Sequence, residues 1–188
     1  EDVAGKNQVI LDVLVDKKQK MKVRHIYIEG NEFLKASKIK GGFLKKGAFA
    51  KTHEAGKLSS FLKAKKYTPE RWATDKKNLI DKYNELGFRD AEIIADSVWN
   101  YDGKHVNIYV KVDEGKKYFL RNISWVGNTV YPTDVLSRIL GMNKGDVYNQ
   151  KLLNKRLSED EDAVGNNYWN NGYLFYNLEP AEVNIVGD

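Results

Sequence analysis

The chain has 188 residues, a formal net charge of +5 at pH 7, 41% hydrophobic residues and 30% charged residues. This balance is typical of globular protein and excludes the disordered and fibrous classes, and the length suits one ordinary domain or two small ones. The sequence contains no Cys, which excludes disulfides and cysteine-ligated metal sites, and it contains no apolar run long enough for a membrane helix. Because it begins without an initiator Met or a signal peptide, we interpret it as an excised fragment.

The first elements in chain order are two predicted strands. Apolar residues alternate over residues 9–15 and again over residues 23–29, where Ile26 and Ile28 are expected on the buried face. Gly30 and Asn31 then indicate a turn, because Gly accepts backbone angles that a Cβ forbids. A short helix is expected over residues 34–41.

A Lys-rich segment follows this helix. Residues 33–66 contain ten Lys and one Glu, a local excess of nine positive charges. Such a run is most often a solvated face, but it could also meet phosphate or anionic lipid. Phe43, Phe49 and Phe61 lie within it, so single-stranded nucleic acid or an anionic surface is the alternative partner class. The possible basic patch comprises Lys35, Lys38, Lys45, Lys46, Lys51, Lys63, Lys65 and Lys66.

The next predicted elements are a long helix and a β-hairpin. Thr68 is placed to cap the helix, Pro69 suits its first position, and an apolar stripe at helical spacing leads to Gly87. Two strands are expected over residues 91–100 and 106–113, joined by a turn at residues 101–104. The second strand of the hairpin should have one buried and one wetter face.

The same order of patterns then returns. Residues 120–128 align with residues 23–31, both ending in Gly-Asn, and residues 167–173 align with residues 82–88. A strand is expected over residues 120–126, a short helix over residues 132–140, a helix from Asn149 to Gly172, and a strand at residues 182–186. The last strand of this second copy is absent from the sequence, whereas residues 9–15 match such a last strand with no domain before it. This segment is therefore expected to pair with the second copy of a neighbouring molecule, because an incomplete sheet exposes an unpaired edge.

The sequence therefore predicts an α+β fold with two tandem βααββ repeats. Each repeat is expected to be a small three-stranded mixed sheet with two helices on one face. Residues 1–20 are assigned to the remnant strand and linker, residues 21–115 to the first repeat, and residues 116–188 to the second repeat without its last strand.

This order of elements resembles the POTRA domain, together with the Gly-Asn after the first strand, the Tyr-x-x-x-Gly-aromatic motif that ends the long helix, and Asp113-Glu114-Gly115 after the third strand. POTRA domains occur in tandem on the periplasmic side of outer-membrane β-barrel assembly proteins of the BamA type. The resemblance implies a location on the periplasmic side of the bacterial outer membrane, below a C-terminal barrel that this sequence does not contain. It also implies unfolded outer-membrane proteins as clients and accessory assembly lipoproteins as partners.

In this family's topology the third strand is central, which leaves the second strand as an exposed edge. An extended client could add to this edge through main-chain hydrogen bonds. Glu92 and Asp96 are expected to limit aggregation there. The short linker Asp113, Glu114 and Gly115 is predicted to be a hinge of limited range. The client-binding edge comprises Ala91, Glu92, Ile93, Ile94, Ala95, Asp96, Ser97, Val98 and Trp99.

Enzymatic and metal-binding functions are not expected. The three His residues, His25, His53 and His105, form no arrangement of nucleophile, base and orienting group, and no phosphate-binding loop is present. Residues 159–162 are all acidic but lack the pattern of a calcium loop, so a solvated acidic face is favoured. We therefore predict no catalytic residues, no metal and no cofactor. A nucleic-acid partner is not expected either, because a four-stranded RNA-binding sheet needs a different order of helices and strands.

Overall fold

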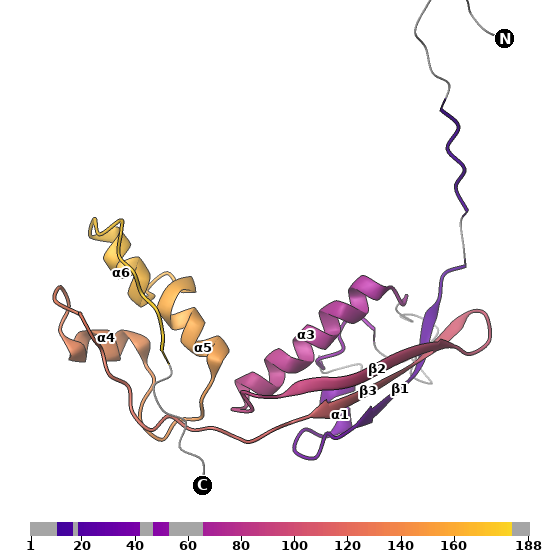
Figure 1. Ribbon diagram of the computed structural model, residues 1–188, viewed down its shortest axis with the longest axis horizontal. Coiled ribbons are helices and arrows are strands. Elements are labelled where there is room, and N and C mark those ends of the chain that lie inside the picture. Colours follow the sequence, from indigo (N-terminus) through magenta and orange to yellow (C-terminus); the bar gives the residue numbers. More distant parts are fainter. Residues whose placement is uncertain (1–10, 17–18, 42–46, 53–65, 182–188) are drawn as a thin grey trace, which may run out of the picture.

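A computed structural model describes residues 11–16, 19–41, 47–52 and 66–181 of the chain. Two parts lie side by side and are joined by an extended segment (Figure 1). The first part contains a three-stranded sheet and the long helix α3, and the second part consists of shorter helices.

The sheet of the first part has the order β1-β3-β2. The strands are β1 (Lys22–Glu29), β2 (Glu92–Asn100) and β3 (His105–Asp113). β1 runs parallel to β3 and β2 runs antiparallel to it, so the predicted mixed sheet with a central third strand is confirmed. β3 is suited to this position because Val106, Ile108, Val110 and Val112 are all buried on one face.

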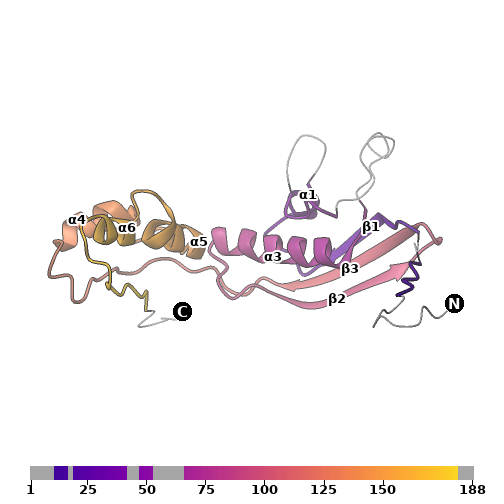
Figure 2. The ribbon, with the colours of Figure 1, turned by 90° about the horizontal axis from the view of Figure 1, so that it is seen from above.

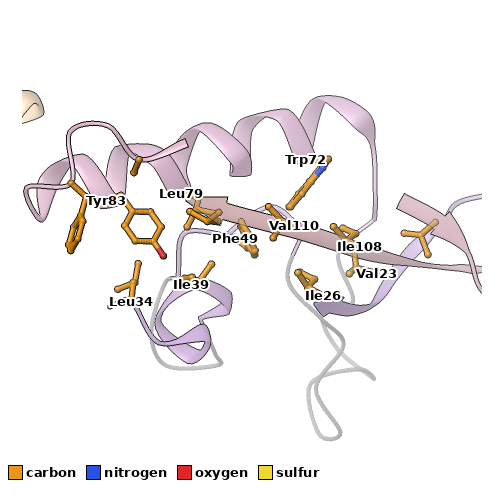
Figure 3. Close-up of a cluster of buried hydrophobic side chains, with 14 residues drawn as sticks. Val23, Ile26, Leu34, Ile39, Phe49, Trp72, Leu79, Tyr83, Ile108 and Val110 are labelled. Atoms are coloured by element: carbon orange, nitrogen blue, oxygen red, sulfur yellow. The ribbon is translucent and has the colours of Figure 1, made fainter. Parts of the chain in front are cut away.

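Two helices cover one face of this sheet (Figure 2), and they are α1 (Ala36–Lys40) and α3 (Pro69–Glu85). Thr68 caps α3 as predicted, since its side chain accepts a hydrogen bond from the Arg71 N–H at 3.3 Å. The core between α3 and the sheet is apolar (Figure 3) and includes Val23, Ile26, Leu34, Ile39, Phe49, Trp72, Leu79, Tyr83, Ile108 and Val110.

The Gly-Asn turn after β1 brings two backbones close together. Gly30 has φ +79°, and a Cβ built on it would lie 1.9 Å from the carbonyl oxygen of Val112 in β3. The Asn31 side chain donates to the carbonyl oxygen of Leu34 at 3.0 Å and so closes the turn. Gly at this position therefore serves both the backbone angle and the close approach of β3.

Part of the Lys-rich segment belongs to the core. Phe49 is fully buried, and its ring lies edge-on to Trp72 with the centroids 5.2 Å apart. The buried carboxylate of Asp75 in α3 accepts hydrogen bonds from the Lys51 and Thr52 N–H groups and from the Thr52 hydroxyl. Phe49 is thus a core residue and does not stack on a ligand, whereas Phe43 and Phe61 lie outside the described residues.

The second part contains α4 (Thr133–Leu140), α5 (Gln150–Asn154), a π-helical turn η1 (Lys155–Glu159) and α6 (Val164–Asn170). The single helix predicted from residue 149 to residue 172 is therefore wrong, although Asn149 does cap its start, accepting from the Leu152 N–H. The chain leaves helical conformation at Asp160, which has an extended backbone. Arg156 pairs with both Asp160 and Asp162 there, and Glu159, Glu161 and Asp162 are exposed, so the acidic run is solvated but lies where the helix ends.

The predicted strand at residues 120–126 is also wrong, because the described second part contains one isolated bridge, between Phe119 and Val147, and no β-strand. The period-two pattern still describes the packing, since Ile123 and Trp125 lie half-buried against the core of this part. In the first part β1 pairs with β3 and not with β2. The described residues of the second part contain no counterpart of β3, so residues 120–126 have no central strand there with which to form a ladder.

Residues 11–16 form no strand and extend away from the first part (Figure 1). Leu11, Val13, Leu14 and Val15 are exposed. Of the strand predicted at residues 9–15, the described residues 11–15 are thus not in a strand, and no described strand pairs with them. Residues 9–10 and the strand predicted at residues 182–186 lie outside the described residues.

Candidate functional site

The candidate site is the outer edge of β2. Because β2 pairs with β3 on one side and is last in the sheet order, its other side carries backbone groups that no strand of the described chain engages. The sequence prediction placed the client-binding edge at residues 91–99, and the strand occupies residues 92–100. Ala91 precedes the strand and is buried in the core.

The register of the hairpin determines which backbone groups point outward. Opposed residues of an antiparallel pair alternate between hydrogen-bonded and non-hydrogen-bonded pairs. The Tyr101 N–H donates to the His105 carbonyl at 2.8 Å, which fixes the phase of this alternation. Asp96 opposite Val110 and Val98 opposite Ile108 therefore direct N–H and C=O away from β3. Asn100 does the same at the end of the strand.

A bulge divides the edge. The register shifts between Ile93 and Ala95, so that Ile94 has no opposing residue. Bulges interrupt a ladder and twist an edge away from regular pairing. The regular part of the edge is therefore residues 95–100, shorter than the predicted nine residues.

The side chain of Asp96 does not guard this edge as predicted. Its carboxylate accepts from the Trp72 indole N–H at 2.7 Å and pairs with Lys76 at 3.0 Å. Burial raises the pKa of this carboxyl, but the bonds from Trp72 and Lys76 outweigh burial and leave the pKa lowered. Asp96 thus attaches β2 to α3, whereas Glu92, at the far end beyond the bulge, is exposed outside the regular part of the edge.

The other edge of the sheet is partly covered. The Tyr67 N–H donates to the Met21 carbonyl at 2.8 Å, and Lys66 forms an isolated bridge with Lys22 at the start of β1. No comparable backbone bond reaches Asp96, Val98 or Asn100 from any part of the chain that the structure describes. The β2 edge is therefore the better place for an added strand.

The four described lysines of the predicted basic patch do not gather in one place. Lys45, Lys46, Lys63 and Lys65 lie outside the described residues. Lys38 lines a shallow pocket that also contains Asp81, Glu85 and Lys151, whereas Lys66 lies beside the start of β1. Lys35 and Lys51 are exposed, and Lys51 uses its backbone N–H to bond Asp75.

The predicted hinge residues differ in their surroundings. The Glu114 carboxylate accepts from the Phe33 N–H at 2.8 Å, the Leu34 N–H at 3.2 Å and the Tyr83 hydroxyl at 2.7 Å. Asp113 is exposed and accepts from the Gly115 N–H at 2.9 Å. Glu114 thus holds the linker to the first repeat, and any bending has to begin after it.

Backbone hydrogen bonds and an ion pair between the two parts further restrict the linker. The Tyr118 N–H donates to the Gly87 carbonyl at 2.8 Å, and the Tyr148 N–H donates to the Tyr118 carbonyl at 3.0 Å. Lys151 pairs with Glu85 at 2.6 Å, which raises the pKa of the Lys151 ammonium. These contacts were not predicted from the sequence, because the residues that form them lie far apart in the chain.

The buried carboxylate of Asp75 was not predicted, although the sequence pattern contains an indication of it. Asp75 lies at a helical spacing of three after Trp72 and four before Leu79, so it occupies a position of the apolar stripe. An acid on such a stripe indicates a buried carboxylate with backbone donors, which is its role here.

In the described residues no helix combines the length and apolarity that crossing a bilayer requires. The same residues contain no group of three or more His, Asp or Glu arranged to hold a metal ion.

The sheet, the helices on one face and the recurrence of the Gly-Asn turn define a tandem α+β repeat module. The family model described as a surface antigen variable number repeat, POTRA, matches residues 21–115 and 118–188. The chain therefore belongs to the POTRA family, as its sequence pattern indicated.

Curated relatives and a solved structure agree with this assignment. The chain is 23% identical over 163 residues to the outer membrane protein assembly factor BamA of Neisseria meningitidis serogroup B, a match that covers 86% of this chain and 20% of that protein. It is 29% identical over 85 residues to BamA of Buchnera aphidicola, covering 44% of this chain and 14% of the relative. The chain thus spans about a fifth or less of the length of these relatives.

The fold matches the crystal structure of POTRA3-5 of Haemophilus influenzae BamA with a TM-score of 0.53 at 19% identity. This match covers 77% of the chain and 54% of that structure.

Proposed function

We propose that this chain is a POTRA segment of an outer-membrane protein assembly factor and that it holds unfolded β-barrel clients by strand addition at β2. The names of the two relatives support a role in outer-membrane protein assembly, since both are outer membrane protein assembly factors. The observation that supports this mechanism is that the backbone N–H and C=O groups of Asp96, Val98 and Asn100 point away from β3, on an edge that no described strand covers. We place the segment on the periplasmic side of the bacterial outer membrane, with accessory lipoproteins as further partners.

The energetics suit transient holding. Three outward residues offer up to six backbone groups, each worth about 0.5–1.5 kcal/mol net when bonded. Ordering the guest strand offsets much of this gain. Main-chain bonds do not depend on the guest's side chains, so the edge can accept many sequences and release them again.

An amide-resolved NMR titration tests the proposal. The ligand is an extended peptide taken from a barrel strand, and the shifts are expected at Asp96, Val98 and Asn100. Shifts confined to Lys35, Lys38, Lys51 and Lys66 would instead support binding by charge.

Two N-methylated peptides test whether the binding in this titration uses main-chain hydrogen bonds. N-methylation of the peptide at every second residue blocks one of its edges, and methylation at the intervening residues blocks the other edge. Because the two peptides have the same composition, a large difference between them requires main-chain pairing. In the protein, Val98→Pro removes a donor that points outward, without removing a ladder bond to β3, and is expected to abolish the shifts while the chain stays folded.

A further inference from the structure

One end of the first repeat brings together four segments that are distant in the sequence. The Lys22 N–H donates to the Lys104 carbonyl at 2.9 Å, so the start of β1 lies against the turn between β2 and β3. Lys66 bridges to Lys22, and the Arg71 guanidinium donates to the Lys66 carbonyl at 3.1 Å. We call this region the hairpin end, and its cations are Lys20, Lys22, Arg24, Lys66, Arg71 and Lys104.

The cations of the hairpin end lack acidic partners. Among the described residues, no ion pair involves any of the six, whereas Lys76, Lys111 and Lys151 elsewhere each pair with a carboxylate. The acids on these segments are Glu70 and Asp102. The six cations outnumber these two acids, and Asp102 bonds the N–H groups of Lys104 and His105 within its own turn. A positive excess therefore remains at this end.

Exposed aromatic rings adjoin these cations on the sheet face opposite α3. Tyr27, Trp99 and Tyr101 are 49%, 42% and 51% exposed. Tyr27 and Trp99 stack with their centroids 6.0 Å apart and their planes 12° from parallel. The Arg24 guanidinium lies 3.7 Å above the Tyr101 ring. Half-exposed Tyr and Trp beside cations are the combination found where proteins meet a membrane–water interface.

The geometry points to an anionic lipid surface as the partner of the hairpin end. Charge complementarity supplies the attraction, because each Lys or Arg near an anionic leaflet raises membrane affinity about fivefold. Nucleic acid also carries negative charge, but base stacking needs free ring faces. At this end Tyr27 and Trp99 stack on each other and Arg24 covers one face of Tyr101, so the rings are better placed to anchor by their exposed edges.

Binding of the whole 188-residue chain to vesicles tests this inference. Vesicles of phosphatidylcholine with about one-third phosphatidylglycerol are compared with pure phosphatidylcholine, at salt concentrations of about 0.05 M and 0.3 M. We expect sedimentation with the anionic vesicles alone, weakened at the higher salt. Equal binding to the neutral vesicles would overturn the proposal.

A pair of charge-matched variants locates the surface. Lys22→Glu with Lys104→Glu is expected to lower the affinity for anionic vesicles at least about 25-fold. Lys77→Glu with Lys144→Glu makes the same change in net charge at exposed positions elsewhere, and a loss of less than about threefold is expected. An equal loss in both pairs would overturn the assignment to the hairpin end, provided that thermal unfolding shows both pairs folded.

Two further measurements complete the test. Trp99→Ala removes an aromatic ring without changing charge, and it is expected to lower vesicle affinity about tenfold while leaving the salt dependence unchanged. If Trp99→Ala binds as the unaltered chain does, the aromatic part of the proposal fails. A single-stranded oligonucleotide that binds more tightly than the vesicles, and loses this affinity in Lys22→Glu with Lys104→Glu, would replace the lipid surface by nucleic acid.

Discussion

The hydroxyl of Tyr83 in α3 donates to the carboxylate of Glu114, at a distance of 2.7 Å, just beyond the end of β3. The same carboxylate accepts the N–H groups of Phe33 and Leu34, which follow the turn after β1. One buried acid therefore joins the long helix, the end of the central strand and the segment before α1. Since Glu114 lies near the end of the first matched repeat, which spans residues 21–115, this cluster also fixes where the linker leaves the first repeat.

Removal of the Tyr83 hydroxyl should give a pH-dependent loss of stability. Burial, followed by the hydrogen bond and charge of Glu114, raises the pKa of Tyr83. Because an unfolded Tyr has a pKa of about 10, the stabilisation from this proton is complete below about pH 10 and is lost as the pH rises further. Tyr83→Phe should cost about 1–3 kcal/mol at neutral pH. The difference in the free energy of unfolding between the unaltered chain and Tyr83→Phe should narrow above about pH 10, by up to about 1.4 kcal/mol per pH unit.

Urea unfolding between about pH 8 and pH 11 measures this gap. Other tyrosines with raised pKa values, Tyr67, Tyr109 and Tyr168, are present in both proteins and cancel in the comparison. A gap that stays constant over the whole range would contradict the role given to Tyr83.

The two Gly-Asn turns allow a matched test of close backbone approach. Gly30 and Gly127 have φ of +79° and +77°, so Ala at either position costs about 1–2 kcal/mol for a left-handed backbone. A Cβ at Gly30 would also lie 1.9 Å from the Val112 carbonyl, whereas a Cβ at Gly127 would meet nothing within 4 Å. Gly30→Ala should therefore destabilise its repeat by at least about 2 kcal/mol more than Gly127→Ala destabilises the other.

Amide hydrogen exchange, resolved for each repeat, provides the measurement. Equal losses of stability in Gly30→Ala and Gly127→Ala would mean that β3 moves away from residue 30 at little energetic cost.

Local patterns in the sequence predicted the first repeat well, for identifiable reasons. Thr68 and Pro69 begin α3 where a cap and a first-turn Pro belong, and the alternation in β3 gives its buried face. The burial of the other face of β3 was harder to predict. Asn107 was expected to be wetter, but it is 5% exposed because it lies in register between His25 and Trp99.

The second repeat and the candidate edge depend on non-local pairing, which periodicity does not encode. Residues 120–126 have the pattern of a strand, but a ladder needs a neighbouring strand, and the part of the chain that the structure describes provides none there. On β2, the bulge at Ile94 limits the regular edge to residues 95–100, and no local pattern in the sequence predicts it. The position of β2 as the edge came from the family resemblance and not from its residues.

The joint between the repeats should change when Gly87 is substituted. Gly87 has φ +94°, and its Cβ would lie 2.5 Å from Cγ1 of Val147 and 3.1 Å from the Tyr118 carbonyl. Gly87→Ala is therefore expected to displace residues 145–149 and to weaken the bond from the Tyr118 N–H to the Gly87 carbonyl. Small-angle scattering and residual dipolar couplings should report a wider distribution of angles between the repeats.

A second substitution separates the two causes. Val147→Ala removes the clashing methyl groups, so the double variant should regain part of the original geometry, whereas Val147→Ala alone should change it little. If the double variant is as displaced as Gly87→Ala, the backbone angle and not the contact with Val147 controls the joint.

Replacement of Asn107 should stabilise the first repeat. The Asn107 side-chain oxygen is buried, and among the described residues it has no hydrogen-bond partner. A buried acceptor without a partner costs about 1–3 kcal/mol, whereas Val suits a central strand and carries no polar atom. Asn107→Val should therefore raise the free energy of unfolding by about 1 kcal/mol, measured by urea denaturation. Asn107→Asp, which buries a charge at the same position, should lower it. A loss of stability in Asn107→Val would show that the amide contributes more through its NH₂ group than its oxygen costs.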